Sequence, residues 1–69
     1  MEYYEVDFAD GYGMCIKAKR QPTIEEANEF YKEDTEKYGG IINVLGPYTR
    51  EEVAPFYDME YEDNWLVFR

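Results

Sequence analysis

The chain has to fold without a disulfide or a structural zinc ion, and this limits what can hold it together. Its 69 residues include one cysteine, Cys15, and no histidine. A lone thiol forms no internal disulfide, and one thiolate does not complete a tetrahedral zinc site. A chain of this length buries only about 60% of the surface that its unfolded form exposes. The core must therefore come from apolar and aromatic side chains, which include eight Tyr, four Phe and one Trp.

Two early segments alternate apolar and polar residues, a pattern typical of half-buried β-strands. They are residues 2–8 and 14–19, and the glycine-containing segment between them predicts a hairpin turn. With a two-residue loop, the apolar side chains of the two strands would lie on opposite faces of the hairpin. A three-residue loop over 10–12 keeps them together and pairs Phe8 with Met14. We therefore expect a hairpin with this odd-length loop.

Residues 23–38 give the clearest helical pattern. Thr23 and Glu26 have the spacing of a capping box, in which each side chain bonds the backbone N–H of the other residue. Apolar residues then recur at helical spacing as far as Tyr38. The glycine pair at 39–40 ends the pattern. We expect one helix whose apolar stripe faces the sheet.

The second half of the chain predicts two strands and a short helix. Residues 41–45 are almost continuously apolar, which favours a central strand. A second capping box begins a helix at Thr49, and Pro55 interrupts it. An acidic loop over 58–64 then leads to a closing strand at 65–68.

Together these elements predict a single α+β domain over residues 1–69, in the order β-β-α-β-(short α)-β. One mixed or antiparallel sheet carries the main helix on one face. The expected core consists of Tyr4, Val6, Phe8, Met14, Ile16, Ile24, Ala27, Tyr31, Ile42, Val44, Leu66 and Phe68.

The charge and the residue types exclude several classes of function. Sixteen acids against seven bases give a net charge of −9, which opposes direct binding to nucleic acid or to an anionic membrane. Without serine or histidine, the chain cannot build a Ser–His or Cys–His nucleophile pair. It also has no glycine loop of the phosphate-binding kinds. We therefore expect no enzyme activity and no cofactor.

The sequence favours the cytoplasm as the location of the protein. Its longest apolar runs have two to four residues, far fewer than the ~20 that span a bilayer. No signal peptide is visible, and a single unpaired cysteine is typical of reducing compartments.

The charge is unevenly distributed along the chain. From Glu51 to Phe68 there are six acids and no base, whereas Lys17, Lys19 and Arg20 gather near the end of the second predicted strand. Tyrosine and tryptophan are favoured anchors in protein interfaces, and carboxylates steer a basic partner. The sequence therefore predicts a surface that binds a basic protein, formed by Tyr57, Asp58, Glu60, Tyr61, Glu62, Asp63 and Trp65.

Other interpretations stay open. The surplus aromatic side chains could be buried in a homodimer, and the acidic face could be ordinary solvated surface. The carboxylates of the same segment could bind a divalent cation weakly, although their spacing matches no EF-hand loop. Cys15 shares a strand face with Lys17, which would lower the thiol pKa, but a structural cysteine is the simpler interpretation.

Two stretches of the chain resemble known proteins. Residues 16–27, with their strand and capping box, and residues 56–60 are similar to short uncharacterised proteins of bacterial plasmids, conjugative elements and phages. In size and acidity alone, the chain also resembles anti-CRISPR proteins and other inhibitors of host defence. This resemblance of class implies a non-enzymatic inhibitor encoded by a mobile element, and it transfers no site residue.

Overall fold

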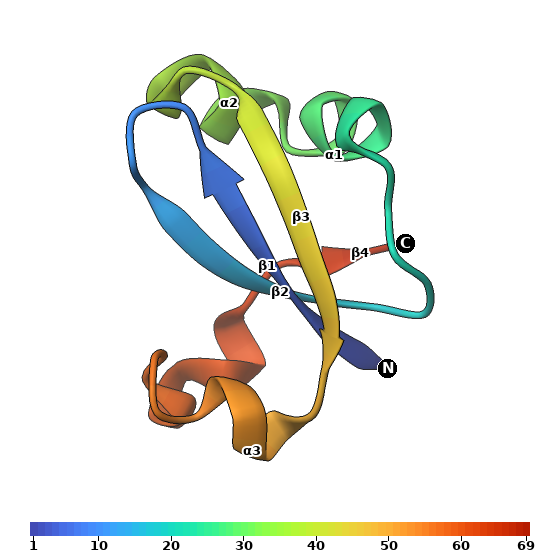
Figure 1. Ribbon diagram of the computed structural model, residues 1–69, viewed down its shortest axis with the longest axis vertical. Coiled ribbons are helices and arrows are strands. Elements are labelled where there is room, and N and C mark those ends of the chain that lie inside the picture. The colour runs from blue at the N-terminus through green and yellow to red at the C-terminus, as the bar shows by residue number, and fades with distance from the viewer.

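An α+β fold is built around one mixed sheet, as the sequence predicted (Figure 1). The computed structural model describes residues 1–69, apart from the side chain of Asn64. Over these residues the sheet has four strands in the order β3-β1-β2-β4. The elements along the chain are β1 Glu2–Phe8, β2 Gly13–Ala18, α1 Ile24–Phe30, α2 Lys32–Tyr38, β3 Ile41–Tyr48, α3 Arg50–Val53, the 3-10 helix η1 Met59–Asn64 and β4 Val67–Phe68.

β1 and β2 form the centre of the sheet as an antiparallel hairpin. The loop has three residues, as expected, but it begins one residue earlier than predicted. Gly11 ends it with a φ of +98°, which glycine adopts without strain. Val6 consequently pairs with Met14 and not with Ile16. The observed pairing differs from the expected one by two residues along β2. Every side chain therefore stays on the same face of the sheet, and the alternating pattern alone does not distinguish the two registers.

The first face of the sheet packs against α1 and α2 and forms the main core. Its buried residues are Tyr4, Val6, Phe8, Ile16, Ala18, Ala27, Tyr31, Ile41 and Val44, with Met14, Tyr38 and Phe68 packed against them. Three residues of the expected core, Ile24, Ile42 and Leu66, are exposed instead. In β3 the buried isoleucine is Ile41, because a register irregularity next to its partner Phe8 turns Ile42 outward.

The predicted single helix is divided into α1 and α2 at Tyr31. The backbone of Tyr31 has a φ of −103° and a ψ of 47°, outside the helical region. Hydrogen bonding continues across this bend, since the Tyr31 N–H donates to the Ala27 carbonyl at 2.9 Å and the Thr35 N–H donates to the Tyr31 carbonyl at 2.9 Å. The capping box of Thr23 and Glu26 is present as predicted.

β3 lies at an edge of the sheet, which contradicts the prediction that its apolar run made it central. Two amide side chains cover part of its outer edge. The Asn28 amide accepts from the Ile41 N–H at 2.8 Å and donates to the Ile41 carbonyl at 3.2 Å. Gln21 donates to the Val44 carbonyl at 2.9 Å. These bonds occupy backbone groups that an edge strand otherwise offers to another chain.

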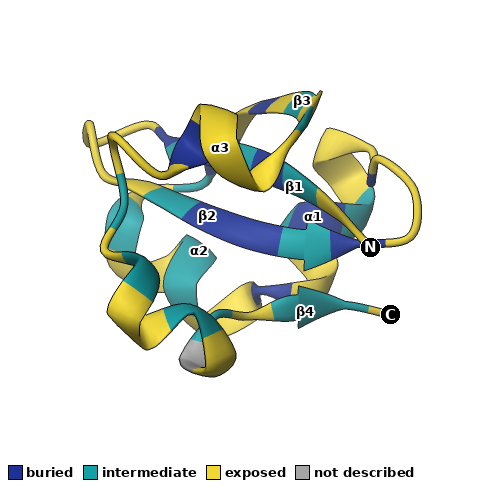
Figure 2. Ribbon diagram, turned by 90° about the horizontal axis from the view of Figure 1, so that it is seen from below, coloured by how far each residue is buried: buried dark blue, intermediate teal, exposed yellow. Residues whose placement is uncertain are grey.

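The second face of the sheet is covered by residues 49–66, which we call the C-terminal segment. It contains α3 and η1, and in Figure 1 it lies below the sheet while α1 and α2 lie above. Its helix α3 begins at the predicted capping box of Thr49 and Glu52 and ends two residues before Pro55. Figure 2 shows buried residues concentrated in β1 and β2, with α3 mostly exposed. The predicted closing strand is reduced to β4, which pairs in parallel with β2.

Asn28→Ala should lower the free energy of unfolding by about 2–3 kcal/mol, because backbone groups of buried Ile41 lose their partners. The Thr35 hydroxyl also loses the acceptor to which it donates at 3.0 Å. Urea denaturation followed by circular dichroism measures the change. Glu29→Ala, at the exposed neighbouring position, is the control and should change stability by less than about 0.5 kcal/mol. Equal midpoints for the two variants would contradict the role of Asn28.

Candidate functional site

The seven residues predicted to bind a partner fall into two groups in the structure. Four of them are exposed on the C-terminal segment, namely Asp58, Glu60, Tyr61 and Asp63. The other three are partly buried and contact the protein's own sheet or one another, namely Tyr57, Glu62 and Trp65. The second group therefore fixes the C-terminal segment in place.

Tyr57 connects the C-terminal segment to the middle of β1. Its hydroxyl donates to Glu5 Oε1 at 2.9 Å. Burial raises the pKa of Tyr57, and the bond to Glu5 and the charge of that carboxylate raise it further. The Tyr57 ring lies 5.9 Å from Trp65, edge to face, and Trp65 packs in the same way on Tyr3 at 6.2 Å. Such aromatic pairs stabilise by about 0.5–1.5 kcal/mol beyond the area that they bury.

Glu62 is the second connection between this segment and the sheet. It accepts hydrogen bonds from the Tyr3 hydroxyl and from Arg50 Nε, the latter at 2.8 Å. The Tyr3 bond, followed by the Arg50 bond, lowers the pKa of Glu62, and the same Tyr3 bond raises the pKa of Tyr3. These contacts join β1, α3 and η1, so Glu62 belongs to the framework of the site.

The outward side of the segment combines carboxylates with two exposed rings. Phe56 is 78% exposed and Tyr61 is 56% exposed. The Asp58 side chain accepts from the Glu60 N–H at 3.1 Å and caps η1. We call Phe56, Asp58, Glu60, Tyr61 and Asp63 the acidic–aromatic surface. Sequence reasoning missed Phe56, which lies in the turn after α3.

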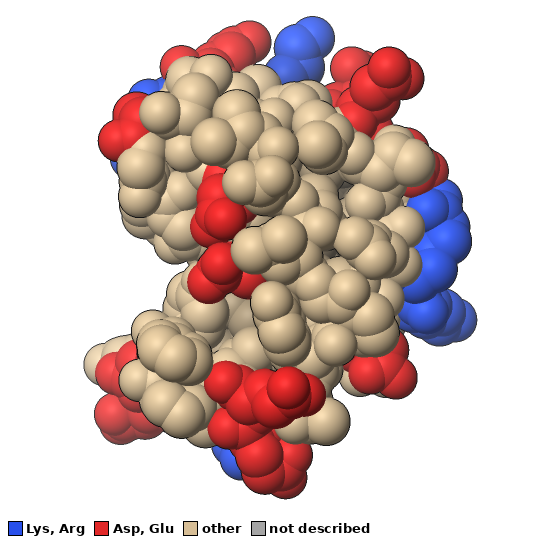
Figure 3. All heavy atoms as spheres, in the orientation of Figure 1, with Lys and Arg blue, Asp and Glu red and all other residues tan. Residues whose placement is uncertain are grey.

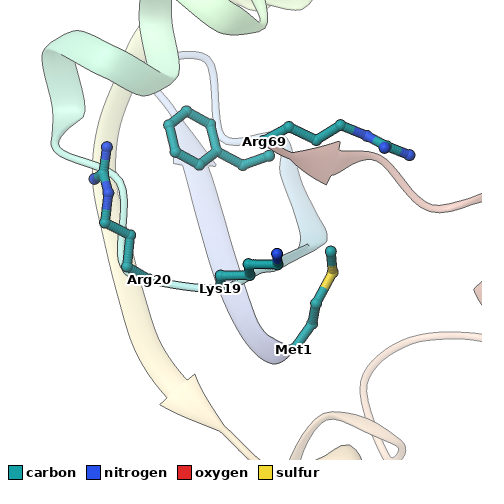
Figure 4. Close-up of a pocket in the computed structure, with 5 residues that line it drawn as sticks. Met1, Lys19, Arg20 and Arg69 are labelled. Atoms are coloured by element: carbon teal, nitrogen blue, oxygen red, sulfur yellow. The ribbon is translucent and has the colours of Figure 1, made fainter.

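Basic side chains gather at a different place, on the edge of the molecule shown at the right of Figure 3. A pocket of about 500 Å³ lies there, lined by Met1, Lys19, Arg20, Phe68 and Arg69 (Figure 4). The Arg20 guanidinium forms a two-pronged ion pair with Glu26, at 2.9 and 2.5 Å, and lies 5.4 Å from the centre of the Phe68 ring. The bond to Arg20 helps lower the pKa of Glu26 to about 2. The charge of Arg20 is therefore already paired within the chain.

Cys15 has the environment of a structural cysteine. Its side chain is buried on the second face of the sheet, and its backbone pairs with Glu5. Burial raises the pKa of the thiol to about 11, with the charges of Glu5 and Glu62 acting in the same direction and Lys17 opposing them. A thiol that stays protonated at neutral pH is a poor nucleophile and a poor metal ligand.

A cation site on the carboxylates of residues 58–63 is the other interpretation of this segment. Among the side chains that the structure describes, no three of the metal-ligating types come together to hold an ion. These four carboxylates do not share one environment. Glu62 accepts hydrogen bonds from Tyr3 and Arg50, whereas Asp58, Glu60 and Asp63 are exposed.

No protein-family model matches this chain, and comparisons with curated proteins and with solved structures find no significant match. The resemblance of residues 16–27 and 56–60 to proteins of mobile elements therefore remains a prediction. Within the part of the chain that the structure describes, none of the helices has the length and apolar character needed to cross a membrane.

Tyr57→Phe should lower the free energy of unfolding by about 1–2 kcal/mol, because Glu5 loses a hydroxyl donor at a half-buried position. Tyr61→Phe removes the same atom from an exposed ring and is the matched control, with an expected change below about 0.5 kcal/mol. Urea denaturation of both variants gives the comparison. A Tyr57→Phe variant as stable as Tyr61→Phe would show that this bond does not hold the segment.

Stability should be constant between about pH 7 and pH 8 and decline as the pH rises above about 9. Burial raises the pKa of Cys15 from 9.0 to about 11 and the pKa of Tyr31 from 10.0 to about 12. A group whose pKa is raised by folding contributes fully below its unfolded pKa, and this contribution is lost as the pH approaches the folded pKa. Urea denaturation across this range, with tyrosinate absorbance recorded in parallel, measures the decline.

Tyr31→Phe is the variant that tests the origin of this decline. The Tyr31 hydroxyl is buried and has no hydrogen-bond partner among the described residues. Removing it should leave stability at pH 7 unchanged or higher, because no bond is lost, and should flatten the decline above pH 10. An unaltered alkaline profile in this variant would be evidence against a contribution from Tyr31.

Proposed function

We propose that this protein is a non-enzymatic interaction module that binds a basic surface of another protein. The exposure of Phe56 and Tyr61 among the carboxylates of the acidic–aromatic surface is the observation that carries the proposal. Figure 3 shows acidic side chains over the part of the molecule that contains α3, away from the basic edge. A partner would meet apolar anchors and mainly negative charge on this surface, because Arg50 of α3 is paired with Glu62.

Physical arguments support this use of the surface. Exposed aromatic rings supply contact area with few side-chain rotations to freeze, and carboxylates increase the rate at which a basic partner arrives. The segment is already held by Tyr57, Glu62 and Trp65, so binding does not have to order it. Binding to a preorganised surface loses less conformational entropy.

The resemblance to proteins of mobile elements adds a biological setting to the proposal. In that setting the module is an inhibitor in the cytoplasm that covers a basic site on a host protein. It acts by occupying a surface and therefore needs no catalytic group.

A homodimer is the second candidate, and the exposed apolar residues of β3 favour it. Ile42 is 52% exposed and Leu45 is 39% exposed. Sedimentation at micromolar concentration distinguishes the two candidates, because a monomer excludes a homodimer as the working form.

Binding should weaken with salt and with changes confined to the acidic–aromatic surface. Affinity capture from a lysate of the encoding cells, at about 50 mM and about 300 mM salt, should recover a basic protein mainly at the lower concentration. Tyr61→Ala, and Glu60→Lys combined with Asp63→Lys, should reduce its recovery. Glu62 is left intact because it supports the fold.

The matched control is Glu25→Lys combined with Glu29→Lys, which makes the same change of charge on exposed positions of α1. This variant should retain most of the binding. If it loses as much as the Glu60 and Asp63 variant, net charge and not the surface governs binding. Recovery of nothing above background at low salt would refute the proposed function.

A further inference from the structure

A second concave site lies where the sheet meets the C-terminal segment. It is a pocket of about 360 Å³, within the size range of small-ligand sites. Residues from β1, the end of β3, α3 and the turn after α3 line it, namely Glu5, Tyr48, Glu52, Val53, Phe56 and Tyr57. Phe56 belongs to both this pocket and the acidic–aromatic surface, so the two are continuous.

The pocket combines two carboxylates with three aromatic rings, and its lining contains no base. Internal hydrogen bonds position both carboxylates. Glu5 Oε1 accepts from the Tyr57 hydroxyl at 2.9 Å, and Glu52 Oε1 accepts from the Thr49 N–H at 2.9 Å. An ionised carboxylate has about four acceptor sites on its two oxygens, so each group can still bind a further donor.

This chemistry selects a cation as the occupant. A positive group between carboxylates and aromatic faces gains ion pairing and cation–π attraction together. A guanidinium fits best, because it is planar, weakly hydrated, able to stack on a ring and able to donate several hydrogen bonds at once. An anion would be repelled, and a neutral apolar group would desolvate the carboxylates without replacing their hydrogen bonds.

We propose that this pocket receives one arginine side chain of the basic partner. The proposal rests on the proposed function and names the group that the partner would insert. The carboxylates of Glu5 and Glu52 hold the guanidinium, and the rings of Tyr48, Phe56 and Tyr57 surround it. The exposed remainder of the acidic–aromatic surface contacts the flanking part of the partner.

Amide chemical shifts recorded by NMR test the proposal with a defined probe. The probe is the blocked tripeptide acetyl-Gly-Arg-Gly-amide, and the comparison is the same peptide with citrulline, which has a similar shape and no charge. The arginine peptide should produce saturable shifts centred on Glu5, Glu52 and Tyr57. The citrulline peptide should produce none. Equal shifts with both peptides, or equal affinity for a lysine peptide, would overturn the choice of a guanidinium.

Two conservative variants locate the binding. Glu52→Gln preserves the capping box, in which glutamine replaces glutamate well, and Glu5→Gln keeps an acceptor for the Tyr57 hydroxyl. Each should weaken the arginine peptide about tenfold, because a charge-assisted bond is lost. Glu51→Gln removes the same charge from α3 outside the pocket and should leave binding within about twofold. Equal weakening by Glu51→Gln would overturn the assignment of the pocket.

The two proposals fail separately. If Tyr61→Ala abolishes capture of the basic protein while the arginine peptide leaves the pocket unshifted, the pocket assignment is wrong and the proposed function stands. If the peptide fills the pocket as expected but no basic protein is captured, the proposed function is wrong and the pocket remains a guanidinium site.

Discussion

The central strand β1 needs cover on both of its faces, and the rest of the chain is arranged to provide it. One face presents Tyr4, Val6 and Phe8, which are buried under α1 and α2. The other face presents Tyr3 and Glu5, which are matched by polar and aromatic groups of the C-terminal segment. The first face is stabilised by apolar area, and the second by hydrogen bonds and edge-to-face rings. This small chain has no internal disulfide, and packing on both faces of a single sheet stabilises it.

This division explains how an acidic chain stays folded. Two acids at the second face of the sheet have partners, since Glu5 accepts from Tyr57 and Glu62 accepts from Tyr3 and Arg50. Other carboxylates, including Asp58, Glu60 and Asp63, face solvent, where hydration and salt reduce their mutual repulsion. The unpaired excess adds to the net charge of −9 and produces a long-range negative field. The exposed carboxylates that we propose to attract a partner are therefore largely separate from those that stabilise the fold, and only Glu5 and Glu52 are proposed to serve in both ways.

Features encoded by neighbouring residues could be predicted from the sequence, and features set by distant contacts could not. The capping boxes at Thr23 and Thr49, the hairpin and the alternating strands depend on residues a few positions apart, and the structure confirms them. β3 is an edge strand because no other strand pairs with its outer side, and the apolar run in its sequence does not reveal this. The hydrogen bond between Tyr57 and Glu5 joins residues that are 52 positions apart in the sequence. In the candidate site, residue types indicated Tyr61 correctly as exposed, but no pattern indicated that Trp65 lies against Tyr3.

The amides of Asn28 and Gln21 have a consequence for how this protein can recognise others. They occupy backbone groups of Ile41 and Val44 that an incoming extended peptide would use to extend the sheet. Strand addition depends little on side-chain identity, because its hydrogen bonds are made to main-chain groups that all polypeptides share. With those positions taken, the proposed partner would be distinguished mainly by the shape and charge of its side chains. This partial cover leaves fewer main-chain groups of β3 open to pairing with an exposed strand of another chain.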